Sequence, residues 1–442
     1  MKRKCIMAML TLSMLLGACG RDISGGEGNE VSAPRTGSGA TVNYTENAGT
    51  LDVPDGQIGE EQTAALAQSS MALFAQSVAE SGEGENVLVS PTSIITAFGM
   101  TENGAEKATL SQMEQVINGG ISVDEMNPLL CDLADRFNSS KDVRWNVANS
   151  IWFKDDGRMR VNPDFAAKAL SYYGADIWGA PFDESTVKDI NNWVNDETRG
   201  MIPEVIDDLD EDARMCLINA IAFEGEWENK YRESDIQKNC DFTNADGSRS
   251  EVTLLHSEED GYFTLGNGTG FVRPYKGGEY SFVGILPDEG ITATDYVAAL
   301  AENGAAFTDA VQNLNYDRDV YVWIPEFTTD YENEMSGMLT TMGMPDAFDQ
   351  ERAEFGAMME PTDPSEVWDI WIGSVIHKTH IEVDREGTRA AAVTAVTMEA
   401  VCTAVAEYEP PVCISLDRPF VYAIVDNETG LPVFLGCMNT ME

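Results

Sequence analysis

The stretch from residue 381 to residue 406, IEVDREGTRAAAVTAVTMEAVCTAVA, decides the fold and changes character part-way along. Its start alternates between apolar and charged side chains, with Ile381 and Val383 separated by Glu382, which is the period of a β-strand. After Gly387 large side chains almost disappear, and alanine, threonine and valine dominate. Such small side chains suit a solvated loop and also fit inside a sheet without collision. An alanine-rich surface helix is the alternative interpretation of this segment taken alone.

Short motifs follow one another in a fixed order in and before this segment, namely His377-Lys378, Ile381-Glu382-Val383, Glu386-Gly387-Thr388 and the alanine run. Their order gives a resemblance to the reactive-loop hinge of the serpins, a large family of protease inhibitors. It implies that a protease attacks the exposed loop and forms an acyl-enzyme with it. The cut loop then inserts as an extra strand into the central sheet, and the attached protease is distorted.

The resemblance covers about residues 60–440. Its further motifs are at residues 86–94 (NVLVSPTSI), 149–152, 162–165, 190–194, 217–227, 343–348 and 418–420. It implies an α+β chain with the serpin fold: a large central mixed sheet, further sheets, about eight to nine helices and an exposed reactive-centre loop at about residues 385–412. Apolar periodicity predicts a helix over 63–78, a buried central strand over 214–223 and an alternating strand over 320–327 that stops at Pro325.

The composition fits a folded chain with a strongly acidic surface. Apolar residues make up 43% of the 442 residues and aromatic residues 9%, which is enough for a packed core. With 28 basic and 75 acidic residues, the formal net charge is −47. A charge of this sign argues against nucleic acid and anionic lipid surfaces as partners.

The N-terminus carries a targeting signal. Basic residues at 2–4 precede an apolar run over 6–16, which is too short to span a bilayer. The run closes with Leu16-Gly17-Ala18-Cys19, which resembles the lipobox of bacterial lipoproteins. That resemblance implies a signal peptide at residues 1–18 and lipidation of Cys19. The chain would then be held at a bacterial cell surface by its lipid anchor alone; a plain secretory signal and a buried helix are the alternatives.

The remaining chain divides into two parts by composition. Residues 19–56 are rich in glycine, serine, threonine, asparagine and glutamate, which predicts a flexible acidic tether. Residues 57–442 are predicted to form a single domain.

Six cysteines follow the predicted lipidation site. None has a CxxC or metal-ligand spacing, and their scatter does not suggest a small disulfide framework. A disulfide between Cys402 and Cys413, which flank the predicted loop, and isolated thiols are the two alternatives. The six are Cys131, Cys216, Cys240, Cys402, Cys413 and Cys437.

The sequence contains no recognisable catalytic set. It has no GxSxG elbow, no HExxH motif and no phosphate-binding glycine loop. His377, His380 and Glu382 are residue types that bind metal ions, but on an alternating strand the two histidines point to opposite faces and could not share an ion. We therefore expect neither enzymatic activity nor a metal or cofactor.

A polar cluster is expected beneath the sheet. In serpins the histidine that matches His377 lies beside the two serines of the SPxSI motif and the asparagine of the buried strand. The resemblance therefore implies a cluster of Ser90, Ser93, Asn219 and His377. Its hydrogen bonds would be exchanged when the strands separate to admit the loop. A static polar patch in the core is the alternative.

An ion pair is expected at the top of the sheet. Family members usually carry glutamate where this chain has Arg385, and the lysine that pairs with it is replaced here by Glu326. Because both signs are reversed, we predict an Arg385–Glu326 pair, with Trp227 packed nearby. If exposed, it contributes about 1 kcal/mol or less. Two unrelated surface charges are the alternative.

The predicted hinge has small side chains on its inserting face, and Arg389 falls on the opposite face. Counting from Arg385 by the usual hinge-to-bond length of the family places the reactive bond at Val401–Cys402, with Met398, Ala400 and Thr403 as alternatives. A small apolar residue there suits an elastase-like protease, and the absence of arginine and lysine between 390 and 416 argues against a trypsin-like one. The predicted hinge residues are Arg385, Glu386, Gly387, Thr388, Ala390, Ala391, Ala392 and Thr394.

These observations together predict a monomeric inhibitor that forms a covalent complex with an elastase-like serine protease. A non-inhibitory binding protein on the same fold, which uses the loop only for recognition, is the alternative. A cell-surface hydrolase is disfavoured because no catalytic set can be assembled.

Overall fold

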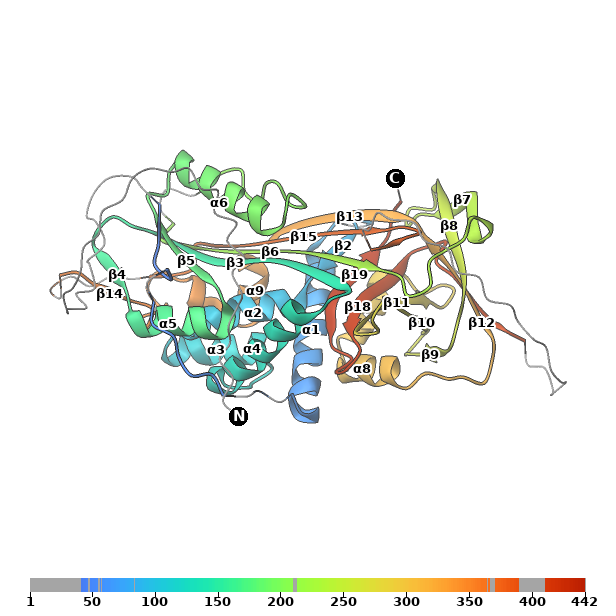
Figure 1. The fold of residues 1–442 in the computed structure, drawn as a ribbon, viewed down its shortest axis with the longest axis horizontal. Coiled ribbons are helices and arrows are strands. Elements are labelled where there is room, and N and C mark those ends of the chain that lie inside the picture. The colour runs from blue at the N-terminus through green and yellow to red at the C-terminus, as the bar shows by residue number, and fades with distance from the viewer. Residues whose placement is uncertain are drawn as a thin grey trace, which may run out of the picture.

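A seven-stranded mixed sheet runs along the length of the molecule (Figure 1). The computed structural model describes residues 41–441, apart from positions 47, 55, 57, 83, 210–212, 364, 366–369 and 389–409. In spatial order the strands are β1 (Val42–Asn43), β5 (Asp176–Ala180), β3 (Val143–Lys154), β6 (Met215–Glu226), β16 (Gly387–Thr388), β15 (Ser374–Val383) and β13 (Phe327–Glu334). β3 and β6 pair antiparallel, whereas β6 and β15 pair parallel.

Three smaller sheets complete the β structure. The six-stranded sheet contains, in order, β2 (Val87–Val89), β19 (Pro432–Met438), β18 (Phe420–Asp426), β11 (Tyr280–Pro287), β10 (Gly268–Pro274) and β9 (Tyr262–Thr264). The four-stranded sheet contains β17 (Val412–Ser415), β12 (Val320–Pro325), β8 (Arg249–Glu259) and β7 (Ile236–Thr243). The last pairs β14 (Met359–Pro361) with β4 (Met159–Val161).

Nine α-helices lie within the described residues, in agreement with the predicted eight to nine. Helices α1 to α5 and α9 lie below the large sheet in Figure 1, and α6 lies on its opposite face. The helices are α1 (Glu60–Glu80), α2 (Pro91–Glu102), α3 (Lys107–Ile117), α4 (Val123–Ser139), α5 (Pro163–Tyr173), α6 (Glu184–Glu197), α7 (Ala293–Leu300), α8 (Ala305–Gln312) and α9 (Ser336–Met342). Short 3-10 turns occur at Glu233–Asp235 and Pro345–Phe348. The predicted α+β class is confirmed.

The elements expected from periodicity are present. The predicted first helix is α1, and the predicted alternating strand is β12, which ends at Pro325 as expected. The SPxSI motif begins α2, where the Ser90 hydroxyl caps the helix by accepting from the Ser93 backbone N–H and Pro91 occupies the first turn.

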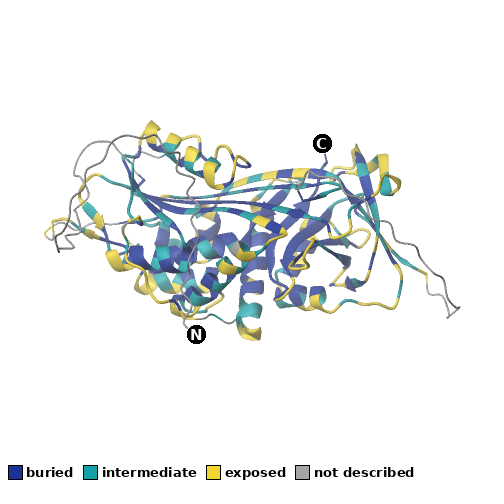
Figure 2. Ribbon diagram, in the orientation of Figure 1, coloured by how far each residue is buried: buried dark blue, intermediate teal, exposed yellow. Residues whose placement is uncertain are grey.

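Strand β6 is buried on both faces, as its continuous apolar run predicts. Its residues contribute alternately to two hydrophobic clusters. Cys216, Ile218 and Ala220 pack with α6, whereas Met215 and Leu217 pack with the helices on the other face. Figure 2 shows this central region almost entirely in the colour of buried residues.

The described end of the predicted tether is packed on the domain, which corrects its predicted boundary. Strand β1 pairs antiparallel with β5 at the edge of the large sheet. The Asn43 side chain donates to Asp176 at 2.8 Å, and the Tyr44 hydroxyl donates to Asp155 at 2.8 Å. Composition predicts a linker here because these side chains are polar. Their hydrogen-bond partners are residues of the folded domain, which composition does not reveal.

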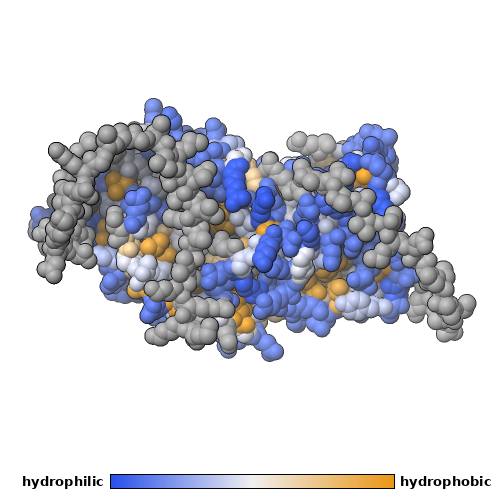
Figure 3. All heavy atoms as spheres, viewed as in Figure 1, coloured by the Kyte–Doolittle hydropathy of each residue, from blue (hydrophilic) through white to orange (hydrophobic). Residues whose placement is uncertain are grey.

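The face of the molecule seen in Figure 3 is largely hydrophilic where its residues are described. Figure 3 shows mostly blue residues on the visible face, with small and interrupted apolar patches. Among the residues that the structure describes, the large exposed hydrophobic side chains are those of Leu51 and Tyr316. In the same part of the chain, no helix is both long enough and apolar enough to cross a membrane.

Candidate functional site

The site lies where β6 and β15 separate. The two strands pair directly from Cys216–Ser374 up to Ala222–His380. Beyond that point β16 lies between them, and Thr388 pairs with Val383 on one side and Gly225 on the other. The first two residues of the predicted inserting strand therefore already occupy the sheet.

Gly387 can occupy its position because it has no side chain. A Cβ atom there would lie 2.1 Å from the carbonyl oxygen of Gly225, far inside the van der Waals limit. The next residue, Thr388, is fully buried, and its hydroxyl lies 2.6 Å from the hydroxyl of Tyr275. Close contact with the backbone of β6 thus requires a glycine at position 387.

The hinge forms a tight turn between β15 and β16. The backbone N–H of Asp384 donates to the carbonyl of Gly387 at 2.9 Å. The Asp384 carboxylate in turn accepts the backbone N–H groups of Glu386, at 2.7 Å, and Gly387, at 3.0 Å. Aspartate at the first and glycine at the fourth position is a common β-turn signature, so the sequence itself carries a signal for this turn.

A segment after β6, residues 227–231, binds the outside of this turn, and we call it the clamp. The Trp227 backbone N–H donates to the carbonyl of Glu386 at 3.1 Å, and its indole N–H donates to that of Asp384 at 2.8 Å. The Tyr231 backbone N–H donates to the carbonyl of Arg385 at 3.4 Å. Because Trp227 is 1% exposed, the clamp holds the turn from a fixed position in the core.

Charged side chains also hold the hinge turn in place. The Lys230 ammonium lies 3.1 Å from the Glu386 carboxylate and 3.2 Å from that of Glu226. The predicted pair is also in place, with Arg385 Nε 3.2 Å from Glu326 Oε1 and Arg385 Nη1 3.6 Å from Glu233. About a third of the Arg385 side chain is exposed, so this pair is worth at most about 1 kcal/mol.

The structure brings the predicted polar cluster together beneath the pairing of β6 with β15. Asn219 and His377 are cross-strand partners, and the His377 Nδ1 lies at hydrogen-bond distance from the Asn219 carbonyl oxygen. The Asn219 amide donates to the Ser93 hydroxyl at 2.5 Å, and the Ser90 backbone N–H donates to His377 Nε2 at 3.1 Å. Asn149 completes the cluster, since its carbonyl oxygen accepts from Asn219 at 2.7 Å.

His377 is held in its neutral form. Because Nε2 accepts from the Ser90 backbone N–H, the proton is on Nδ1, which donates to Asn219. The ring is fully buried, and this burial lowers the pKa of His377 from 6.5 to about 3.

His377 is expected to make the protein less stable in acid. Unfolding exposes the ring and restores its higher pKa, so the unfolded chain binds the proton first. Between pH 6.5 and 3, the contribution of His377 to the free energy of unfolding falls by about 1.4 kcal/mol per pH unit. Denaturant unfolding at pH 7 and pH 5 of the wild type and of His377→Gln, which keeps a donor and an acceptor, measures it. The difference between the two proteins should shift by about 2 kcal/mol, and an equal loss in both would contradict the assignment.

His380 lies on the opposite face of β15, as the strand period predicts. Its ring lies 2.7 Å from the Asp330 carboxylate, and its side chain is 15% exposed. No group of three or more potential metal ligands occurs in the part of the chain that the structure describes. Cys413 in β17 is exposed and carries a free thiol.

Several predicted site residues lie outside the described residues. These are the lipidation residue Cys19, the hinge residues Ala390, Ala391, Ala392 and Thr394, and the reactive-bond residues Val401 and Cys402. Three further residues of the site carry no signal in the sequence, since only the strand register and the position of the clamp bring them there: Asn149, Tyr275 and Lys230.

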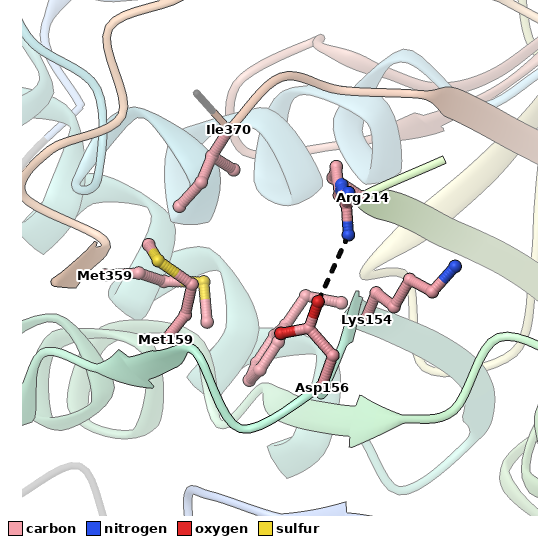
Figure 4. A pocket seen from close by; sticks show the side chains of 7 residues that line it. Lys154, Asp156, Met159, Arg214, Met359 and Ile370 are labelled. Carbon is pink, nitrogen blue, oxygen red and sulfur yellow. Dashed lines mark hydrogen bonds and ion pairs between the residues drawn. The ribbon is translucent and has the colours of Figure 1, made fainter. Parts of the chain in front are cut away.

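A shallow pocket lies at the other end of the sheet (Figure 4). Its volume of about 20 Å³ is little more than one water molecule needs. Arg214 and Ile370, which border it, precede β6 and β15 in the chain, so the pocket marks the end of the sheet away from the hinge. The Arg214 guanidinium lies 3.4 Å from Asp156. The remaining lining residues are Phe153, Lys154, Met159 and Met359.

Comparison with known proteins decides the family. The family model described as "Serpin (serine protease inhibitor)" matches residues 64–440. The chain belongs to the serpin family. Among curated proteins, it is 28% identical over 394 residues to mouse leukocyte elastase inhibitor A, covering 85% of this chain and 98% of that protein. It is 27% identical over 382 residues to human glia-derived nexin, covering 82% and 89%.

Solved structures agree with this assignment. The thermophilic serpin tengpin in its native state is 36% identical and superposes with a TM-score of 0.83, covering 91% of this chain and 100% of tengpin. Tengpin in its latent state is 35% identical with a TM-score of 0.74, covering 88% and 100%. This serpin is thus more similar to the native form than to the latent form.

Proposed function

We propose that this serpin inhibits serine proteases as a suicide substrate, by cleavage of its reactive loop and insertion of the loop between β6 and β15. The observation that carries the proposal is β16, which pairs with both strands at once. Members of the family are protease inhibitors, and two relatives named above are an elastase inhibitor and a nexin.

The register of β16 supports insertion without a slip of the neighbouring strands. Thr388 pairs with Gly225 and Val383, which are 158 positions apart in the sequence. Where the strands pair directly, Cys216 and Ser374 are also 158 positions apart. β6 and β15 therefore need only move apart sideways, because a new strand continues the same register.

The same register assigns a partner to each inserting residue. Thr394 would lie between Asn219 and His377, which are hydrogen-bonded to each other in the uncut chain. Its hydroxyl can donate to one of them and accept from the other, so it replaces the bond that insertion breaks. Ala390 and Ala392 would face the buried side of β15, where large side chains would collide.

The length of the sheet supports the position of the reactive bond. Counting on from Thr388, residue Met398 reaches Met215, the first residue of β6. Val401 lies three residues further, just past the end of the sheet and near the pocket at Ile370. Insertion of the whole strand would therefore carry an acyl group on Val401 to the far end of the molecule, as the proposed mechanism requires.

An elastase-like target and a location at the cell surface belong to the same proposal. A valine before the scissile bond fits a shallow apolar primary pocket. The signal motif that ends at Cys19 supports a lipid-anchored protein outside the cytoplasm, with the residues before β1 as a spacer, and we expect it to act as a monomer. A non-inhibitory carrier of the same fold is the alternative.

Mixing with pancreatic elastase tests the proposal. We expect a complex that survives denaturing electrophoresis, and mass spectrometry of the released peptide should place the cut after Val401. A loop that is cut with no stable complex would contradict inhibition of that protease. If no protease of a panel of serine proteases forms a complex, and if cutting the loop does not raise the stability of the protein, the non-inhibitory carrier is favoured.

A further inference from the structure

A buried ion pair lies directly behind the clamp. Arg273 in β10 and Glu259 at the end of β8 lie 2.6 Å apart, and their side chains are 5% and 6% exposed. The Ser257 hydroxyl also donates to the Glu259 carboxylate at 2.6 Å. Both charged residues sit among the aromatic and aliphatic side chains beneath the top of the sheet, where an unpaired charge would be costly.

One guanidinium contacts three of the five clamp residues. Its central carbon lies 4.2 Å from the ring centroid of Tyr231 and 5.0 Å from that of Trp227. Its Nη2 donates to the backbone carbonyl of Asn229 at 2.5 Å. Arg273 thereby fixes both aromatic rings and the backbone between them, using its planar fork and its charge together.

We propose that Arg273, oriented by Glu259, is a positioning residue that holds the clamp against the hinge turn, so that insertion starts from a turn already formed. The inference rests on the proposed inhibitory function. Closing a turn and its first strand pair is the entropically costly part of adding a strand. A loop whose turn is already closed needs only to extend pair by pair.

A turn that is formed in advance matters because insertion of the loop competes with hydrolysis of the acyl-enzyme. The acyl-enzyme is either hydrolysed, which releases a cut inhibitor, or trapped by insertion. Faster insertion shifts this competition toward the trapped complex. A loosened clamp would leave the fold and the inserted end state intact, yet it would delay the first step.

The test replaces both charges, because removing one would leave the other buried and unpaired. In Glu259→Leu/Arg273→Met, side chains of similar size fill the space but none binds the Asn229 carbonyl. We expect the ratio of cut to complexed inhibitor to rise about fivefold, with the melting temperature of the intact protein nearly unchanged. Arg273→Lys, which keeps the charge but not the planar fork, should give an intermediate ratio.

Hydrogen exchange of the uncut protein gives a readout that does not depend on inhibition. Peptides that contain residues 384–388 should exchange faster in the double variant than in the wild type. An unchanged exchange rate or an unchanged ratio of cut to complexed inhibitor would overturn the inference. If wild-type protein forms no complex while the exchange difference is present, the clamp is supported and the proposed inhibitory function fails.

Discussion

Ala392→Arg is expected to turn this serpin from an inhibitor into a substrate of its target protease. In the register set by Thr388, an inserted residue 392 would lie opposite Ile221 and Thr379, both of which are buried. An arginine there would place an unpaired charge under the sheet, at a cost of about 3–5 kcal/mol. Insertion would stop part-way, and hydrolysis of the acyl-enzyme would win.

Titration of the protease with each variant measures this effect. The fraction of inhibitor recovered as stable complex should fall about 100-fold in Ala392→Arg, as a loss of ~3 kcal/mol implies. Ala391→Arg is the matched control, because residue 391 would face outward, on the same side as the natural Arg389, and its charge would stay in water. The control should inhibit like the wild type. Equal inhibition by both variants would show that this register is wrong.

Much of this site is predictable because its chemistry is local in the sequence. The hinge stands out through its small side chains, and the cluster of Ser90, Ser93, Asn219 and His377 follows from motifs that the family keeps. The predicted closeness of Arg385 and Glu326 also holds in the structure, at 3.2 Å. The cluster and the ion pair were predictable because the resemblance to the family says which distant positions lie together, whereas the small side chains of the hinge are visible in the sequence itself.

The features of the site that could not be predicted from the sequence depend on contacts between segments that are far apart in the chain. Asn149 joins the polar cluster only because β3 pairs with β6 in the register that sets it opposite Asn219. The Arg273–Glu259 pair joins β10 to β8, and no local pattern marks either residue as buried. Whether β16 lies inside the sheet likewise depends on the pairing energies along the whole strand. Composition does not reveal these energies.

A cut loop is expected to make the protein much more stable. Ten further residues, 389–398, would then join the sheet opposite β6 and β15, while the seven direct pairs between those strands are lost. The net gain is on the order of ten backbone hydrogen bonds, each worth about 1 kcal/mol. For a chain of this size, that corresponds to a rise of about 10 °C or more in melting temperature. On the proposed mechanism, the intact protein would be kinetically trapped in a less stable state than the cut one.

Thermal unfolding of the intact and cut proteins, at one heating rate, tests this difference in stability most directly. The cut is made between residues 398 and 404 and verified by mass spectrometry, and cut Ala392→Arg serves as the control. We expect the cut wild type to melt about 10 °C or more above the intact protein, whereas cut Ala392→Arg should gain little. A cut wild type that melts at the temperature of the intact protein would contradict the account.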